Sequence, residues 1–252
     1  MDKRIGAQYY TIREHCQTLA DFDASCQKVK DIGYQTVQLS GIGKFAAGEV
    51  KEVLDKYGLE AVCTHRPAKN YLEHLEEEIA FHKTIGCKIC GLGAMPGHNG
   101  KEETVEQFAA DFKPVAEELS KHGLVFAYHN HAFEFEKRNG KYVFDILMEK
   151  MGEENLQLIL DVYWLAYAGI NPAKFIREHQ GQIACVHLKD LKMVGQEPRF
   201  AEVGRGNLDW DEILLACEEA GVQYALVEQD TCEGDPFDSL KVSYHFLKSK
   251  GY

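Results

Sequence analysis

Long apolar runs are absent from this sequence of 252 residues. A membrane-spanning helix needs about 20 consecutive apolar residues, and no stretch of the chain approaches that length. The residues Met1-Asp-Lys-Arg-Ile-Gly6 lead directly into a strand-like segment and lack the apolar core of a signal peptide. We therefore expect a cytoplasmic protein with no membrane partner.

Basic residues are scarce relative to acidic ones. The chain has 28 Lys and Arg residues against 40 Asp and Glu residues, a formal net charge of −12. A surface of this sign repels the phosphate backbone, which argues against nucleic acid as a partner. The remaining composition, 45% hydrophobic and 27% charged, is that of an ordinary globular protein with a large core.

Paired cysteine motifs of the zinc-ribbon kind are also missing. The eight cysteines are scattered and stand mostly in apolar runs. One CxxC, Cys87-Lys-Ile-Cys90, has no second pair to complete a metal site. We expect buried free thiols instead of disulfides.

What the sequence does contain is a unit repeated six times: a helix-like stretch, a glycine and a short strand-like run. Glycine tolerates the left-handed conformation that ends a helix, so each glycine marks a turn from helix to strand. The six glycines are Gly33, Gly58, Gly86, Gly123, Gly181 and Gly221. Two further strands, Ile5–Tyr10 and Leu156–Asp161, fit the same spacing.

These segments make eight strands, beginning near residues 5, 36, 60, 88, 125, 157, 184 and 224. Amphipathic stretches with apolar residues three or four apart predict helices between them. The predicted helices are Leu19–Ile32, Val50–Tyr57, Tyr71–Ile85, Val105–Lys121, Tyr142–Met151, Pro172–His179, Trp210–Ala220 and Phe237–Lys248.

Eight strand-helix alternations over this length are typical of one α/β fold, the (β/α)₈ TIM barrel. The main alternative, a doubly wound open sheet, usually has a glycine-rich phosphate turn, and Gly41-Ile-Gly43 alone is weak evidence for one. No linker or low-complexity tract divides the chain. We expect residues 1–252 to form a single barrel domain.

Four predicted strands in the second half end in side chains that can bind a metal. They read Phe126-Ala-Tyr-His129, Leu158-Ile-Leu-Asp161, Cys185-Val-His187 and Ala225-Leu-Val-Glu228. The carboxyl ends of all strands in such a barrel face the same mouth, so the four side chains should converge there. Two imidazoles and two carboxylates suit Mn²⁺, which we predict, and also Zn²⁺, Fe²⁺ or Co²⁺, whereas Mg²⁺ prefers an all-oxygen shell.

Taken one at a time, these residues have simpler interpretations. A single His at a strand end is more often a hydrogen-bonded structural residue than a ligand. Asp161 alone could cap a turn, and Glu228 alone could belong to an ion pair. Their occurrence at four consecutive strand ends favours one shared site.

Further motifs surround these strand ends: Tyr128-His-Asn-His131 with Phe133-Glu-Phe135, Leu160-Asp-Val-Tyr-Trp164, Val186-His-Leu-Lys-Asp190, Glu202-Val-Gly-Arg-Gly206 with Leu208-Asp-Trp210, and Val227-Glu-Gln-Asp230. As a set they resemble the xylose-isomerase-like barrels, a family that includes sugar and sugar-phosphate isomerases, epimerases and inosose dehydratase. The resemblance covers essentially the whole chain. It implies that Asp161, His187 and Glu228 hold one divalent metal.

The chain departs from many relatives on the fifth strand. Ketose epimerases of the family have Glu where this chain has His129, and their two metal-bound glutamates move a proton between the faces of a carbon. A metal-bound imidazole is a poor proton shuttle, although it can still be a ligand. His129 therefore favours one-sided chemistry, which is isomerisation or β-elimination.

Three residues are candidates for proton transfer and charge stabilisation. We predict Glu228 as both metal ligand and base, since a carboxylate within hydrogen-bond reach can remove a proton next to a carbonyl. Glu134 is a second candidate acid or base. Lys189 could hold a developing oxyanion, or it could only pair with Asp161 or Glu228.

Five residues are candidates for substrate binding. His65 ends the third strand, and His131 shares a face with His129 because strand side chains alternate. Trp164 could pack against a sugar ring, since apolar sugar faces stack on aromatic rings. Glu202 and Arg205 lie on the connection after the seventh strand, where barrels keep lids. The simpler interpretations are that His131 fills the barrel, that Trp164 packs in the core and that Arg205 belongs to a solvated charged loop.

The sequence thus predicts a metal-dependent sugar or sugar-phosphate isomerase or epimerase that forms an enediolate. The alternative is a lyase that dehydrates a keto-sugar or an inosose. An apurinic endonuclease shares the barrel but requires a His where this chain has Trp164, and a non-catalytic sugar-binding barrel is a fourth option. The sequence does not identify the substrate or say whether it is phosphorylated. The fold is compatible with a homo-oligomer.

Overall fold

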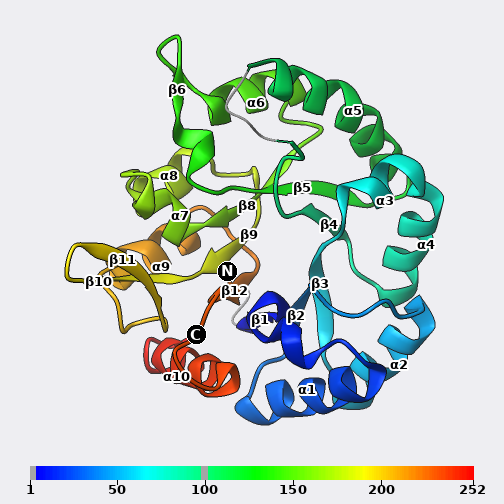
Figure 1. The fold of residues 1–252 in the computed structure, drawn as a ribbon, viewed down its shortest axis with the longest axis vertical. Helices are drawn as coiled ribbons and strands as arrows, with labels where there is room; N and C mark the ends of the chain where they lie inside the picture. Colours follow the sequence, from blue (N-terminus) through cyan, green and yellow to red (C-terminus); the bar gives the residue numbers. More distant parts are fainter. Residues whose placement is uncertain (1–3, 98–101) are drawn as a thin grey trace.

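The computed structural model describes residues 4–97 and 102–252. Eight parallel strands close into a barrel in the order β1-β12-β9-β8-β5-β4-β3-β2. Figure 1 shows the helices around it. The barrel strands are β1 (Gly6–Gln8), β2 (Thr36–Ser40), β3 (Glu60–His65), β4 (Ile89–Leu92), β5 (Val125–His129), β8 (Gln157–Asp161), β9 (Ile183–Leu188) and β12 (Ala225–Val227). The predicted (β/α)₈ fold is confirmed. Residues 1–3, part of the N-terminal segment considered above, lie outside the described residues.

The helices lie between the strands, as the sequence pattern predicts. Their bounds are α1 (Leu19–Ile32), α2 (Ala47–Tyr57), α3 (Ala68–Glu73), α4 (Leu75–Ile85), α5 (Glu102–Lys121), α6 (Val143–Met151), α7 (Val162–Tyr167), α8 (Pro172–Glu178), α9 (Trp210–Glu219) and α10 (Pro236–Ser249). Two 3₁₀ helices, η1 (Tyr9–His15) and η2 (Phe133–Phe135), follow β1 and β5. All six repeat glycines have positive φ, from 59° at Gly58 to 123° at Gly33, as helix-to-strand turns require.

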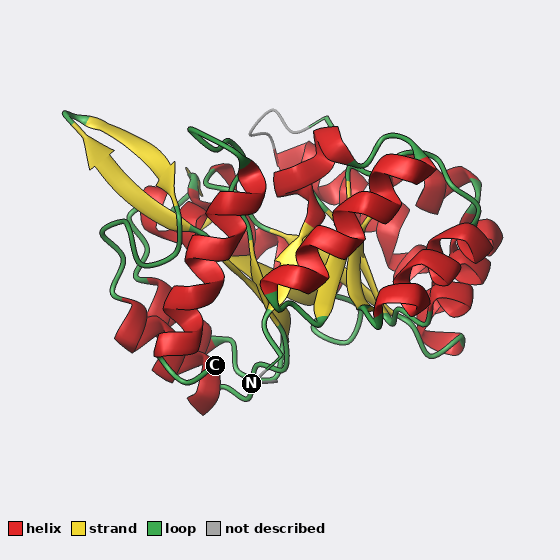
Figure 2. Cartoon of the chain, turned by 90° about the horizontal axis from the view of Figure 1, so that it is seen from below, coloured by secondary structure: helices red, strands yellow, loops and turns green. Residues whose placement is uncertain are grey.

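Three parts of the chain differ from the sequence prediction. The helix expected over Tyr71–Ile85 is broken at His74, whose ψ of 39° ends α3 and starts α4. The connection after β9 forms a hairpin of β10 (Asp190–Val194) and β11 (Glu197–Ala201), which projects from the barrel in Figure 2. A smaller hairpin pairs β6 (Lys137–Arg138) with β7 (Lys141–Tyr142). The smaller hairpin turns at Asn139-Gly140, whose positive φ values of 48° and 85° suit a tight hairpin turn, so this dipeptide was a signal that sequence reasoning missed.

Two apolar clusters pack between the barrel and its helices, and a third, smaller cluster fills the barrel interior. The interior cluster consists of Val62, Cys63, Ile89, Ala127, Ile159, Cys185 and Leu226. Nearer the carboxyl ends of the strands, buried polar side chains such as Gln38, His129 and Asp161 take over. This change of polarity along the barrel axis places a polar site above an apolar floor.

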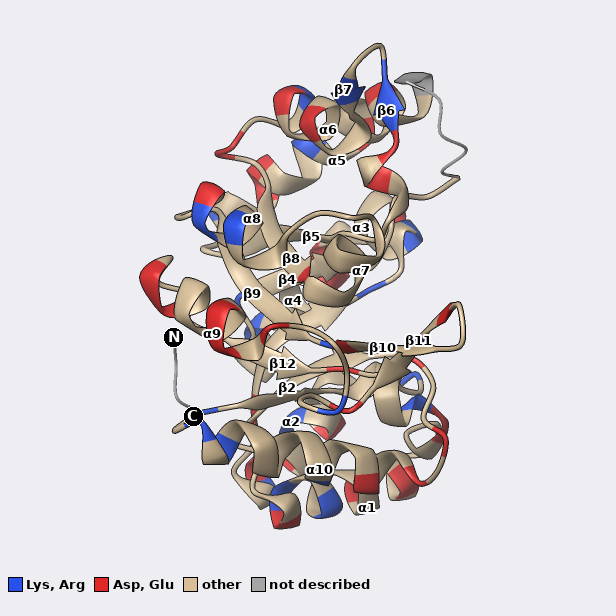
Figure 3. Cartoon of the chain, turned by 90° about the vertical axis from the view of Figure 1, so that its left-hand side faces the viewer, with Lys and Arg blue, Asp and Glu red and all other residues tan. Residues whose placement is uncertain are grey.

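All eight cysteines are free, and seven of them are buried, which confirms the prediction of buried thiols. Among the described residues, no helix is both long and apolar enough to span a bilayer. Figure 3 shows that Lys and Arg residues and Asp and Glu residues both lie on outer helices such as α8 and α10.

Candidate metal and substrate site

The four side chains at the ends of β5, β8, β9 and β12 meet in space. One potential ligand atom from each of His129, Asp161, His187 and Glu228 lies within 4.8 Å of the other three. All four residues are buried. The strand register produces this convergence, because Asp161 pairs with His187 and Glu228 N donates to Leu188 O at 3.2 Å. The cluster therefore has the composition that the sequence predicts.

Each imidazole of the cluster has one nitrogen engaged outside it. His187 Nε2 lies 2.7 Å from Gln38 Oε1, an acceptor, so this nitrogen carries a proton and donates it. His129 Nδ1 likewise donates to the carbonyl of Gly93 at 3.1 Å. In the neutral tautomers that these bonds select, His187 Nδ1 and His129 Nε2 present lone pairs to the cluster. This is the arrangement by which proteins orient metal-binding histidines.

The two inward nitrogens face carboxylate oxygens. His187 Nδ1 lies 2.9 Å from Glu228 Oε2 but, among the described residues, has no aligned hydrogen-bond partner. His129 Nε2 lies 3.3 Å from Asp161 Oδ2. Burial lowers the pKa of His187, but the charge of Glu228 outweighs burial and raises that pKa above its ordinary value. Lone pairs that face carboxylates at these distances require a cation, either a proton or a metal ion.

Lys189 brings a positive charge to the same point. Its Nζ lies 3.2 Å from Asp161 Oδ2, 3.4 Å from Glu228 Oε2 and 2.6 Å from Asp230 Oδ1, and the residue is 1% exposed. Burial opposes the charged form, but these carboxylates raise the pKa of Lys189 above its ordinary value. Burial raises the pKa of Asp230, while its contact with Lys189 favours the carboxylate form. With all three acids ionised, two negative charges remain, and one divalent cation would neutralise them.

The residues therefore fit a single divalent metal ion on two counts. The set of donors, two imidazoles and two carboxylates, suits Zn²⁺, Mn²⁺, Fe²⁺ or Co²⁺. A cation would also satisfy His187 Nδ1, which lacks a hydrogen-bond partner among the described residues, and would neutralise the excess of carboxylates.

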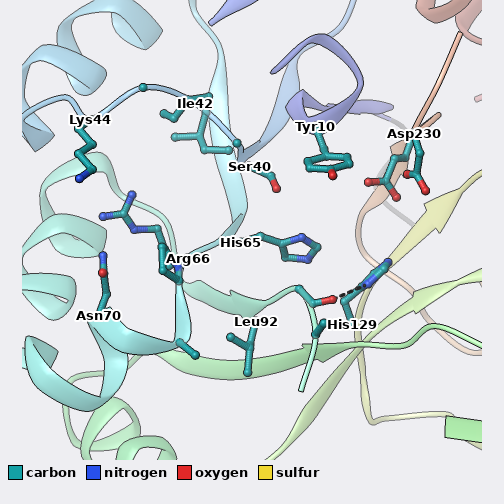
Figure 4. Close-up of a pocket in the computed structure, with 18 of the residues that line it drawn as sticks. Tyr10, Ser40, Ile42, Lys44, His65, Arg66, Asn70, Leu92, His129 and Asp230 are labelled. Atoms are coloured by element: carbon teal, nitrogen blue, oxygen red, sulfur yellow. Dashed lines mark hydrogen bonds between the residues drawn. The ribbon is translucent and has the colours of Figure 1, made fainter. Parts of the chain in front are cut away.

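A cavity of about 830 Å³ opens from this cluster across the ends of β2, β3 and β4. Its inner end is lined by His129, Lys189, Glu228 and Asp230. Figure 4 shows His129 and Asp230 on this side of the cavity. Glu228 and Asp230 are the only acidic residues among its described lining residues. A ligand in the cavity would therefore meet carboxylates from one strand end only.

Three predicted substrate-binding residues lie at or beside the cavity. His65 and His131 line it, and the Trp164 ring lies 5.4 Å from the His131 ring between centroids. His65 Nε2, His131 Nδ1 and Trp164 Nε1 are buried without a hydrogen-bond partner among the described residues. Burial lowers the pKa of His65 well below its ordinary value and that of His131 to about 3, so both rings are neutral. These groups can exchange hydrogen bonds with sugar hydroxyls.

Glu134 is placed differently from the sequence expectation. Its Oε1 accepts from Tyr128 OH at 2.7 Å, its Oε2 accepts from His131 N at 2.8 Å, and it does not line the cavity. Burial raises its pKa to about 7. Glu134 thus ties the turn after β5 and positions His131 from behind, and nothing in this geometry brings it to a substrate.

Glu202 and Arg205 are also not brought to the cavity. Glu202 Oε1 accepts from Ser239 Oγ at 2.8 Å, and Arg205 is exposed. The loop that carries them is held by Asp190, which accepts from the backbone N of Gly204 and of Gly206, each at 2.9 Å. The glycine motif of this loop therefore serves the loop's own structure, because its backbone must approach a buried carboxylate.

Sequence reasoning missed two residues of the site. Gln38 orients His187 from across the barrel, and Asp230 holds Lys189 while lining the cavity. The polar Gln38 between Val37 and Leu39 in the strand Thr36–Ser40 was a signal for this residue. Asp230 stands in the motif Val227-Glu-Gln-Asp230, two residues beyond Glu228.

Comparison with known proteins agrees with this architecture. A family model described as "Xylose isomerase-like TIM barrel" matches residues 26–249. The rhizopine catabolism protein MocC of Rhizobium meliloti is 24% identical over 87% of this chain and 78% of its own length. Inosose dehydratase of Clostridium beijerinckii is 26% identical over 72% of this chain and 68% of its own length.

Solved structures share the fold at lower identity. A sugar phosphate isomerase/epimerase of Parabacteroides distasonis superposes with a TM-score of 0.82 at 19% identity, covering 99% of this chain and 94% of that one. The IOLI protein, solved with a bound zinc atom, has a TM-score of 0.74 at 15% identity and covers 99% of both chains.

Proposed function

Because the chain belongs to the xylose isomerase-like TIM barrel family, we propose that it is a divalent-metal-dependent enzyme that isomerises a sugar or sugar derivative. The first step is removal of a proton from a carbon next to a carbonyl. The observation that carries the proposal is the convergence of His129, Asp161, His187 and Glu228 at the inner end of an open cavity.

The four cluster residues would hold the metal. When bound, the ion supplies Lewis acidity toward the carbonyl oxygen and an adjacent hydroxyl of the substrate. The identity of the metal, with Mn²⁺ as the first expectation and Zn²⁺, Fe²⁺, Co²⁺ and Mg²⁺ as alternatives, is part of the proposal.

Glu228 is the proposed base. It reaches both the cluster and the cavity, and it is 4% exposed. Burial raises the pKa of its carboxyl, but Lys189 and His187 outweigh burial and hold that pKa well below its ordinary value. The group is therefore ionised at neutral pH, so its carboxylate oxygens are available to accept a proton.

Lys189 is the proposed electrostatic partner of the enediolate. Its raised pKa keeps the ammonium charged, so it donates hydrogen bonds and does not act as a base. Asp161, Glu228 and Asp230 hold the Nζ at the inner end of the cavity, and the Trp164 ring centroid lies 5.2 Å from it. A positioned ammonium costs little reorganisation when negative charge develops.

A second candidate is dehydration of a keto-sugar or an inosose. His129 occupies the cluster position on β5, and both acidic cavity residues follow β12. Proton transfer is then confined to one side of the substrate, which suits isomerisation and β-elimination but not two-base epimerisation. The similarity to inosose dehydratase supports this alternative.

Deuterium exchange with product analysis tests both candidates. The purified protein with Mn²⁺ is incubated with keto-sugars and inososes in D₂O, and products are followed by NMR and absorbance. Deuterium at the carbon next to the carbonyl in an isomeric product supports the isomerase. Loss of water with a new conjugated carbonyl absorbance identifies the lyase instead, and no exchange with any substrate contradicts both.

Glu228→Gln should lower the exchange rate by about 10²–10⁴-fold, because the general base is lost. Glu76→Gln is the matched control, since Glu76 is an exposed α4 residue that does not line the cavity. Equal losses in the two variants would remove Glu228 as the base.

A further inference from the structure

The end of the cavity opposite the cluster has a different charge. It is lined by Lys44, Arg66 and Asn70, which belong to the connections after β2 and β3 and to α3. Figure 4 shows these three side chains gathered on one side, with His129 and Asp230 on the other. No described acidic residue lines this end. A long ligand would therefore meet carboxylates at one end of the cavity and positively charged side chains at the other.

Arg66 is held rigidly with part of its guanidinium free. Its Nε and Nη2 donate to the two oxygens of Glu78, each at 2.8 Å, and its Cζ lies 4.3 Å from the centre of the Phe81 ring. Glu78 is 3% exposed and stands behind Arg66, outside the cavity wall. Nη1 has no hydrogen bond to any described residue. A fixed guanidinium edge matches the planar geometry of a carboxylate or phosphate.

Lys44 supplies a second positive charge. It is exposed and makes no ion pair within residues 4–97 and 102–252. Glu78 neutralises one of the two cations, so one positive charge remains at this end of the cavity. The protein as a whole has a formal net charge of −12. The positive charge at this end of the cavity is therefore opposite to the net charge and does not follow from the composition. Two cations that face one cavity repel each other unless an anion lies between them.

We propose that Lys44 and Arg66 form a subsite for an anionic group of the substrate, a carboxylate or a phosphate carried away from the reacting carbonyl. The inference rests on the proposed function, which places the carbonyl at Glu228. It narrows the substrate to acidic sugar derivatives. Asn70, whose Nδ2 donates to Glu78 Oε1 at 2.6 Å, keeps the support of Arg66 in place.

Binding without turnover tests the subsite. Glucitol, gluconate and glucitol 6-phosphate have no carbonyl, and their affinities for the Mn²⁺-loaded protein are measured by calorimetry. At least one anionic ligand should bind about tenfold more tightly than glucitol, as one charge-assisted contact provides. The ligand that shows the preference tells whether the group is a carboxylate or a phosphate.

Substitutions assign the preference to the subsite. Lys44→Gln should remove most of it and Lys44→Arg should keep it, and neither exposed variant disturbs the core. Lys69→Gln is the matched control, because Lys69 is an exposed α3 residue that pairs with Glu73 outside the cavity. A double variant, Arg66→Gln with Glu78→Gln, tests the guanidinium without leaving a buried charge unpaired.

Two results would overturn the subsite: no tighter binding of either anionic ligand than of glucitol, or a preference that survives in both Lys44→Gln and the double variant. Failure of the proposed function gives a different pattern. If the protein prefers anionic ligands but catalyses no deuterium exchange, the subsite stands and the proposed reaction is wrong. If it catalyses exchange but shows no preference for anions, the proposed reaction stands and the subsite is wrong.

Discussion

At the scale of single residues, Gln38 shows how a neutral side chain can control a charged site. Its Oε1 accepts a hydrogen bond from His187 Nε2 at 2.7 Å, which leaves the Nδ1 lone pair of His187 directed toward Glu228. Gln38→Ala should lower metal affinity about 10–100-fold, because an unheld imidazole can rotate or take the other tautomer. Metal titration by calorimetry measures this loss.

The exposed Gln35, three residues earlier in the chain, provides the matched control for that prediction. Gln35→Ala should bind metal as the wild type does. Unchanged affinity in Gln38→Ala would mean that the packing around His187 is enough to orient it.

Glu134 makes a pH-dependent contribution to stability. Burial raises its pKa from the ordinary value of 4.5 to about 7, so between these values the folded state binds more protons than the unfolded state. The free energy of unfolding should therefore fall as the pH rises through this window, by roughly 3 kcal/mol in total, and then level off with respect to this group.

Urea unfolding at a series of pH values measures this slope. In Glu134→Gln the fall between pH 4.5 and 7 should be smaller, because the titrating group is gone. A variant with the wild-type slope would assign the pH dependence to other groups. The absolute stability of the variant is less informative, since the single amide oxygen can accept from His131 N or from Tyr128 OH but does not replace both carboxyl oxygens.

At the scale of elements, Asp190 joins three segments. From the start of β10 it accepts from the backbone N of Gly204 and of Gly206 and from Trp210 Nε1, the last at 2.7 Å. Asp190 is fully buried, and a Cβ on Gly206 would lie 2.3 Å from its Oδ1. One carboxylate thus fixes the path of the loop between the hairpin and α9.

Asp190→Ala should lower the free energy of unfolding by about 3 kcal/mol or more, because several buried donors lose their acceptor together. Chemical denaturation measures the change. Asp209→Ala, which removes only the N-cap of α9, should cost about 1 kcal/mol. Similar losses in both variants would show that solvent replaces Asp190 in holding the loop.

At the scale of the whole molecule, a metal ion held by the cluster would link binding to folding. The cluster residues stand at the ends of β5, β8, β9 and β12, so a bound ion would connect half of the barrel strands. A ligand that binds only the folded state at 100 times its Kd stabilises it by about 2.7 kcal/mol. Mn²⁺ or Zn²⁺ should therefore raise the midpoint of thermal unfolding, and EDTA should reverse the shift.

Asp161→Asn serves as the control for that experiment, since it keeps the shape of a ligand but removes its charge. The metal-dependent shift of the midpoint should be lost or much reduced in this variant. A shift of wild-type size would place the stabilising metal elsewhere on the protein.

The barrel could be predicted because its information is local. Glycines at helix-to-strand turns and apolar periodicity recur unit by unit, and the observed α1 has the predicted bounds, Leu19–Ile32. The break at His74 and the β10–β11 hairpin could not be predicted in this way. Tyr71 of α3 donates its OH to Gly91 O at 3.1 Å, and the ring of Phe200 in β11 lies 4.5 Å from that of Tyr163 between centroids, so both segments are held by residues distant in the sequence.

The sequence by itself determined the barrel and the four cluster residues, because every parallel strand of a barrel ends at the same mouth. Only the tertiary structure decided which nitrogen of each imidazole faces the cluster, and that Gln38 and Gly93 select it. It likewise placed Glu134 behind His131 and Lys44 beside Arg66. Side-chain orientation is set by contacts between residues far apart in the chain, and no local pattern encodes those distances.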